Sequence, residues 1–157
     1  MYKIGIIGPE SSGKSTLAKY LAKRYGGTLV TEYAREYVER KGTTEITYDE
    51  LCTIAKHQIA DLVERNKSKE ESIVFFDTEL IVTKVWFEYA FGQVPEWLED
   101  AIRRYPMDVY LLCKPDIPWK QDGARYNGSD EIRQELFEHY KREIEVLNIP
   151  YYIIEHV

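Results

Sequence analysis

The sequence predicts an α/β fold built around a parallel β-sheet. Five short apolar runs alternate with stretches of helical spacing, and three of the runs show no alternation of apolar and polar residues. Strands without such alternation are typical of a sheet that helices cover on both faces. A glycine-rich segment also follows the first run and opens the first helical stretch. Together these observations favour the α/β class over all-α or all-β folds.

The expected strands and helices follow one another along the whole chain. The apolar runs predict strands at residues 4–7, 29–30, 73–76, 109–113 and 151–154. Apolar residues at three- and four-residue spacing predict helices at residues 14–24, 32–41, 48–67, 79–91, 96–104 and 130–147. Residues 114–129, between the fourth strand and the last helix, contain two prolines and two glycines. Because loops of that length are often functional, we expect a lid there.

Length and composition predict one soluble globular domain over residues 1–157. The chain is 44% hydrophobic and 31% charged, which is too apolar for intrinsic disorder and too interrupted by charge for a membrane span. A net charge of −6 argues against a nucleic-acid partner, because such binding depends on neutralising phosphates. The two distant cysteines do not make a disulfide framework, and the first residues lack the features of a signal peptide. We therefore expect a cytoplasmic protein that does not associate with membranes.

A glycine-bracketed phosphate-binding motif follows the first strand. The segment GPESSGKS (8–15) matches the pattern G-x-x-x-x-G-K-[ST] between a strand and a helix, which is the context that this motif requires. Its glycines let the backbone wrap closely around an anion, and the helix N-terminus adds partial positive charge. We expect Lys14 to reach the β- and γ-phosphates of a nucleoside triphosphate and Ser15 to bind Mg²⁺. The predicted nucleotide-binding residues are Gly8, Glu10, Ser11, Ser12, Gly13, Lys14, Ser15 and Thr16.

Two carboxylates stand just beyond the carboxyl ends of strands, where ligands bind in open parallel sheets. Asp77 ends the third apolar run, a position from which a carboxylate holds Mg²⁺ or accepts the proton of a phosphoryl acceptor. Glu32 follows the second run and could accept that proton or bind a ribose. The alternatives are a helix N-cap for Asp77 and a favourable first-turn acid for Glu32. Arg35 could contact substrate or phosphate, or form an ion pair with Glu32 or Glu39.

The long helix at 48–67 offers a further candidate for substrate binding. Gln58 falls in the middle of the apolar stripe of this helix. Because a buried amide needs hydrogen-bond partners, Gln58 either binds a hydroxyl of the ligand or finds its partners in the core. His57 points the opposite way on the same helical wheel, so we expect it to be exposed.

The expected lid contributes cations and one aromatic side chain. Lys114, Lys120 and Arg125 could close over phosphates, and Arg125 is favoured because a guanidinium makes bidentate contacts that an ammonium cannot. Trp119 could stack on an aromatic base. The alternative is a surface loop with ordinary charges.

A phosphate loop alone does not separate a kinase from a GTPase. The segment CKPD (113–116) partly matches the guanine-reading pattern N-K-x-D, but Cys113 lacks the amide that reads the base. The segment DTEL (77–80) lacks the glycine of a GTPase switch. The chain is also short for a helicase or a transporter ATPase, whereas small-molecule kinases often have this size and a lid after the fourth strand. These points favour a kinase.

Four segments resemble the NadR-type nicotinamide riboside kinase family: GPESSGKSTLAKYLA (8–22), TEYAREYVE (31–39), FFDTELIVTKVW (75–86) and KPDIPWKQDGAR (114–125). The resemblance implies a P-loop kinase fold with a five-stranded parallel sheet in the order 2-3-1-4-5, helices on both faces and a lid after strand 4. It also implies Mg-ATP as donor and transfer of the γ-phosphoryl group to the ribosyl 5′-hydroxyl of nicotinamide riboside. The product would be nicotinamide mononucleotide, which places the reaction in NAD salvage.

The resemblance also suggests roles for individual residues. The loop at 8–16 would bind the phosphates of ATP, with Ser15 and Asp77 at the metal. Glu32 and Asp77 would lie at the acceptor, and either could be the base. Gln121 and Asp122 would belong to the lid and contact the substrate, and Arg125 would close the lid over the reacting groups.

Several positions depart from the family pattern. Glu79 stands where the family has Asp, and Thr31 replaces an aromatic residue that could stack on nicotinamide. The chain ends three residues after the last predicted strand, where such kinases place a loop against adenine, and its length leaves no room for an adenylyltransferase domain. A kinase for another nucleoside or nucleotide, or a regulatory nucleotide-binding module without an acceptor, therefore remains as an alternative.

Overall fold

Five parallel strands form one sheet in the order β2-β3-β1-β4-β5, as the sequence predicts. The computed structural model describes residues 1–9, 12–67, 72–115 and 130–155. The strands are β1 (Tyr2–Ile7), β2 (Thr28–Val30), β3 (Ile73–Asp77), β4 (Val109–Cys113) and β5 (Tyr151–Ile154). In the register of the central strands, Ile4 of β1 lies beside Phe75 of β3 and beside Val109 of β4.

Six helices connect these strands within the described residues. They are α1 (Lys14–Tyr25), α2 (Tyr33–Lys41), α3 (Tyr48–Lys67), α4 (Leu80–Phe91), α5 (Glu96–Arg104) and α6 (Asp130–Leu147). Two starts differ by one residue from the prediction, because Glu32 and Glu79 are the N-caps of α2 and α4 and not their first residues. None of these helices is both long and apolar enough to cross a membrane.

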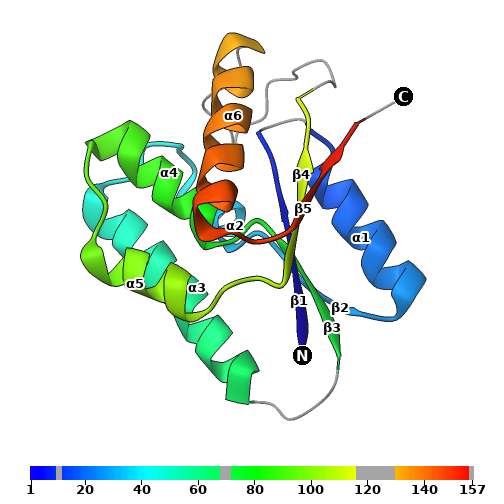
Figure 1. The fold of residues 1–157 in the computed structure, drawn as a ribbon. Helices are drawn as coiled ribbons and strands as arrows, with labels where there is room; N and C mark the ends of the chain where they lie inside the picture. The colour runs from blue at the N-terminus through cyan, green and yellow to red at the C-terminus, as the bar shows by residue number, and fades with distance from the viewer. Residues whose placement is uncertain (10–11, 68–71, 116–129, 156–157) are drawn as a thin grey trace.

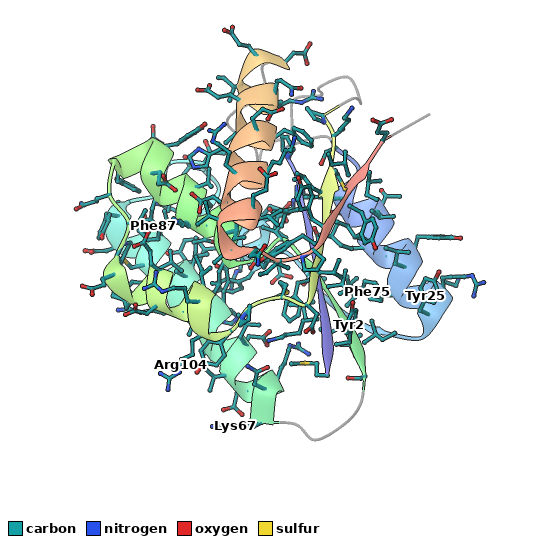
Figure 2. The ribbon with its side chains drawn as sticks, viewed as in Figure 1. Tyr2, Tyr25, Lys67, Phe75, Phe87 and Arg104 are labelled. Carbon is teal, nitrogen blue, oxygen red and sulfur yellow. The ribbon has the colours of Figure 1, made fainter. Side chains whose placement is uncertain are left out.

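Helices cover both faces of the sheet (Figure 1). Helix α1 lies on one face, and α3, α4, α5 and α6 lie on the other. Successive residues of a strand point to opposite faces, so Ile6 joins the core under α1 while Ile7 joins the larger core on the other side. Figure 2 shows the same division, with Phe75 on the α1 side and Phe87 among the helices of the opposite face.

Strand β3 is an inner strand of the sheet, next to the central strand β1, and ends at Asp77. Residues Val74 to Asp77 are buried, since β3 has β1 on one side, β2 on the other and a helical layer on each face. The backbone then turns sharply at Thr78, whose φ of 73° lies in the left-handed region. The amide of Thr78 donates a hydrogen bond to the carbonyl of Ile6 at 2.9 Å. This turn separates Asp77, at the end of β3, from Glu79, at the start of α4.

Candidate active site

The phosphate-binding motif connects β1 to α1 and depends on its glycines. A Cβ at Gly8 would lie 2.7 Å from Oγ of Ser12 and 2.8 Å from the carbonyl oxygen of Cys113, so a larger residue does not fit. Gly13 precedes α1 with a φ of 79°, a conformation that glycine adopts without strain. The first turn of α1 carries no acidic residue, which leaves its partial positive charge for an anion. Glu10 and Ser11 lie outside the described residues.

The side chains that follow Gly13 differ in burial. Lys14 is only 5% exposed, and its Nζ lies 4.0 Å from Oε2 of Glu32. The hydroxyl of Ser15 hydrogen-bonds to Asp77. Thr16 is exposed. The structure therefore brings Lys14 and Ser15 to the two carboxylates predicted at the edge of the sheet.

Asp77 is the buried acid of this cluster. Burial raises the pKa of Asp77, and the nearby charge of Glu32 raises it further. The Ser15 hydroxyl and the charges of Lys14 and Arg35 act in the opposite direction. Oδ1 of Asp77 is buried and has no hydrogen-bond partner among the described residues. The alternative role of Asp77 as a helix N-cap is wrong, because Oε1 of Glu79 accepts the capping hydrogen bond from the amide of Ile81 at 2.9 Å.

Glu32 lies between two cations. Its Oε2 lies 3.5 Å from Nε of Arg35 as well as 4.0 Å from Nζ of Lys14. Glu32 occupies the N-cap position of α2, but its side chain makes no capping hydrogen bond. Of the two ion pairs considered for Arg35, the structure contains the one with Glu32. The carboxylate therefore faces Lys14 of the phosphate loop and does not cap α2.

The cluster has the donor set that Mg²⁺ requires. Magnesium prefers hard oxygen ligands, usually one or two carboxylates together with hydroxyls, waters and phosphates. Asp77 offers a buried carboxylate oxygen with no hydrogen bond within the described residues, beside the hydroxyl of Ser15. These two side chains fit a magnesium ion bound to a triphosphate.

A cavity of about 230 Å³ lies next to this cluster. Its walls come from β2 and the start of α2, from α3, and from the end of β3 and the start of α4. Thr31 and Tyr33, on either side of Glu32, line it, and so do Thr78 and Glu79, which follow Asp77. A group bound in the cavity would therefore contact residues that are next to both carboxylates in the sequence.

Gln58 lines this cavity, and its side-chain oxygen has a partner. Oγ1 of Thr83 donates a hydrogen bond of 2.7 Å to Oε1 of Gln58. This bond joins α3 to α4 across the wall of the cavity. Gln58 thus has a partner within the protein, as one alternative proposed, and it also lies where a ligand would be.

His57 is exposed, as predicted, but it also lines the cavity. Its ring stacks on the ring of Tyr33, with centroids 3.6 Å apart and planes 12° apart. A helical wheel of α3 places His57 relative to its own helix and carries no information about the neighbouring helix α2. The stacked pair is the feature of the cavity that sequence reasoning missed.

Glu79 is a buried acid that also lines the cavity. Burial raises the pKa of Glu79 to about 7, and hydrogen bonds to its carboxylate from the backbone of Ile81 and from the Tyr110 hydroxyl oppose this rise. Burial together with the charge of Glu79 raises the pKa of Tyr110 well above its ordinary value. The acid at this position is therefore tied to the start of α4 and to β4.

The predicted lid contributes little to the described part of the site. Trp119, Lys120, Gln121, Asp122 and Arg125 lie outside the described residues. Lys114 is described, and its Nζ lies 2.7 Å from Oε1 of Glu155, beyond the end of β5.

The comparisons with known proteins agree with this architecture. A family model described as an AAA domain matches residues 3–157. The trifunctional NAD biosynthesis/regulator protein NadR of Escherichia coli strain K12 is 30% identical over 158 residues, which cover 97% of this chain and 38% of that protein. The NadR of Salmonella typhimurium strain LT2 is 31% identical over 137 residues, which cover 83% of this chain and 32% of that protein.

Solved structures of NadR and of a thymidylate kinase are similar to this chain. A crystal structure of NadR in complex with NR has a TM-score of 0.79 and 25% identity, covering 97% of this chain and 43% of that one. A thymidylate kinase from Ehrlichia chaffeensis, at 16% identity, shares the fold, with a TM-score of 0.66 and coverage of 99% and 89%. The chain thus spans about two fifths of the NadR proteins that it matches. It belongs to the AAA domain family and is a P-loop domain homologous to part of NadR.

Proposed function

We propose that this protein is an ATP-dependent kinase that phosphorylates the ribosyl 5′-hydroxyl of nicotinamide riboside. The observation that carries the proposal is that Lys14, Glu32 and Asp77 lie together at the phosphate loop, while the chain neighbours of both carboxylates line a cavity of about 230 Å³. Phosphoryl transfer needs two adjoining sites, one for the triphosphate and one for the acceptor, with charged groups at their junction. We assign the phosphate loop to the triphosphate and the cavity to the acceptor.

The roles of the residues follow from their positions. The backbone of the loop and the α1 N-terminus hold the phosphates, while Lys14 compensates charge on the transferred group. Ser15 and Asp77 would hold Mg²⁺, which when bound neutralises charge on the phosphates. Glu32, whose chain neighbours line the cavity, would accept the proton of the acceptor hydroxyl, and Arg35 would orient Glu32. Arg125 would close the site from the lid.

The charge of the cavity supports a cationic acceptor. Glu36 and Asp61 line it, and Glu79 adds a further negative charge when it is ionised. Among the described lining residues the arginine, Arg65, is paired with Asp61 at 2.8 Å. The pyridinium ring of nicotinamide riboside carries a positive charge and could lie against the stacked rings of Tyr33 and His57. An acceptor that already carries a phosphate would need cations free to receive it, and among the described lining residues Arg65 is committed to Asp61.

The size of the cavity supports a small acceptor. Pockets for drug-sized ligands are about 300–1,000 Å³, so a cavity of about 230 Å³ favours a single nucleoside over a longer chain. The homologous NadR has been crystallised in complex with NR and, in another structure, with NAD and AMP-PNP. Those ligands belong to a related protein and support the same class of acceptor and donor for this chain.

The test is a panel of acceptors with Mg-ATP, in which ADP formation is measured. We expect turnover with nicotinamide riboside and much less with adenosine, cytidine, thymidine and nicotinamide mononucleotide. A preference for another nucleoside would contradict the proposed acceptor and still support the proposed kinase activity. ATP binding without turnover on any acceptor would contradict the kinase and favour a regulatory nucleotide-binding module.

A further inference from the structure

A cluster of metal-binding side chains lies away from the proposed active site, between α4 and α6. Glu88 lies in the last turn of α4, and His139 and Glu143 lie one turn apart on α6. The two helices pack side by side on the face of the sheet opposite α1 (Figure 1). None of the three residues lines the acceptor cavity.

The distances in this cluster suit a metal better than hydrogen bonds. Nε2 of His139 lies 3.5 Å from Oε1 of Glu88 and 3.5 Å from Oε1 of Glu143. A good N–H···O hydrogen bond measures about 2.7–3.2 Å, so the imidazole makes a short one to neither carboxylate. Ligand atoms around tetrahedral Zn²⁺, each about 2.0–2.2 Å from the ion, lie about 3.4 Å from one another. The three atoms all fall within 4.8 Å of one another, so a small ion could bind all three after slight movement.

The surroundings orient the carboxylates toward a common point. Oε1 of Glu88 is buried and has no hydrogen-bond partner among the described residues, although the side chain as a whole is 32% exposed. In Glu143 the other oxygen, Oε2, accepts a hydrogen bond from Nζ of Lys84 at 2.9 Å, which leaves Oε1 on the His139 side. Metal-binding carboxylates are commonly held by such an outer hydrogen bond.

Carboxylates outnumber cations in the ion pairs beside the cluster. Lys84 lies within ion-pair distance of both Glu99 and Glu143, and Glu88 adds a third carboxylate. The Lys84 ammonium offsets one of these three negative charges, and Arg142, whose charge acts on the neighbouring Tyr89, offsets part of the rest. A divalent ion would balance the negative charge that remains. The imidazole ligand selects zinc-like ions over Mg²⁺ or Ca²⁺, which prefer oxygen ligands alone.

We propose that Glu88, His139 and Glu143 bind one Zn²⁺-class transition-metal ion, with water as the fourth ligand, and that this ion ties α4 to α6. The ligands come from elements that are far apart in the sequence, so the ion acts as a cross-link in the folded state. Helix α4 begins directly after the Asp77–Glu79 turn, so the ion would stabilise the helix that continues from the proposed active site. The site does not depend on the proposed kinase activity.

The experiment is a Co²⁺ titration of the full chain without nucleotide, followed by competition with Zn²⁺. We expect one equivalent of Co²⁺ to give the visible absorption of a tetrahedral complex and Zn²⁺ to displace it. His139→Gln and Glu88→Gln should each weaken Co²⁺ binding at least tenfold. His57→Gln, which alters the other described histidine, and Asp77→Asn, which alters the proposed magnesium ligand, should leave the absorption unchanged.

Thermal unfolding gives a second readout that also reports whether each variant folds. Zn²⁺ should raise the melting temperature of the wild-type chain and of His57→Gln, but not of His139→Gln, because only the folded site binds the ion. If His139→Gln does not fold, Glu143→Gln takes its place in both measurements. Absence of saturable Co²⁺ binding, or equal binding by the wild type and the variants of the cluster, would overturn the proposal and leave a histidine that bridges two carboxylates.

Discussion

Lys14 at the start of α1 and Glu32 at the start of α2 lie close together, with Nζ 4.0 Å from Oε2. Both side chains are largely buried, at 6% and 18% exposed. At 4.0 Å the pair attracts without making a short hydrogen bond, so Lys14 can turn toward a phosphate while Glu32 remains beside it. This relationship links the phosphate loop to the acceptor side of the site, and the first two predictions depend on it.

Replacing Lys14 by alanine should abolish kinase activity and leave the fold intact. Lys14 is the described cation of the phosphate loop, and the loss of one such charge lowers turnover by about a hundredfold or more. ADP formation with nicotinamide riboside measures the effect, and circular dichroism reports the fold. Lys19→Ala, on the exposed side of α1, is the matched control and should be as active as the wild type. Equal activity of Lys14→Ala would show that the loop does not hold the triphosphate.

Glu32→Gln and Asp77→Asn should separate the proton acceptor from the metal ligand. Asp77 hydrogen-bonds to Ser15, so Asp77→Asn should raise the Mg²⁺ concentration required for half-maximal rate. Glu32→Gln should lower kcat at saturating Mg²⁺ and leave the Mg²⁺ concentration for half-maximal rate unchanged. Steady-state rates over a magnesium series measure both effects. An altered magnesium requirement in Glu32→Gln alone would reverse the two assignments.

His57→Ala should weaken acceptor binding without affecting ATP. The imidazole stacks on Tyr33 at 3.6 Å and lines the cavity, so its removal takes away part of the surface against which an aromatic base would lie. Loss of one base–aromatic stack is worth about 1–3 kcal/mol, which corresponds to a rise in KM of about five- to a hundredfold. KM values for nicotinamide riboside and for ATP measure the two sites separately. Lys56→Ala is the neighbouring control, since Lys56 lies instead over the ring of Trp97.

Glu79 should make the stability of the protein depend on pH. Its pKa is about 7 in the folded state, above the ordinary value of 4.5, because burial disfavours the charged form. The folded state therefore holds this proton more tightly, and the resulting stabilisation, complete below pH 4.5, is lost as pH rises through 7. The shift predicts a decrease of about 3 kcal/mol in the free energy of unfolding across that range.

Urea denaturation of the wild type and of Glu79→Gln at a series of pH values checks this prediction. The glutamine keeps an oxygen that can accept the capping hydrogen bond but cannot ionise. Its curve should therefore lack the part of the decrease that Glu79 causes and keep the part due to Asp77, whose pKa is also raised by burial. Glu135→Gln on the exposed side of α6 is the control and should follow the wild type. A wild-type curve that stays flat between pH 4.5 and 7 would contradict the assignment.

Most of the fold could be predicted because its signals are local. The strands without apolar–polar alternation and the periodic helices appear where the sequence places them, and the helix starts differ only at Glu32 and Glu79. At those two positions the sequence predicts an acid as the first helical residue, whereas the structure places the acid one residue before the helix. Capping depends on backbone angles that composition does not reveal, so Glu79 was found to be the cap of α4 only in the structure.

The site was predicted less completely, because its parts come from different elements. The motif at 8–15 and the acids after the second and third strands are recognisable one at a time. The contact of His57 with Tyr33 joins α3 to α2, and the cluster of Glu88 with His139 joins α4 to α6. A helical wheel describes one helix alone and therefore cannot show either contact.

The sequence by itself determined the α/β class, the phosphate-binding loop and the acids at the ends of strands, because each depends on residues close together in the chain. The tertiary structure decided that Asp77 lies beside Ser15, that Glu32 faces Lys14, and that a cavity adjoins both acids. The reason is physical. Distances between side chains of different elements depend on the order of the strands and on how the helices pack across the sheet, and these are properties of the whole fold.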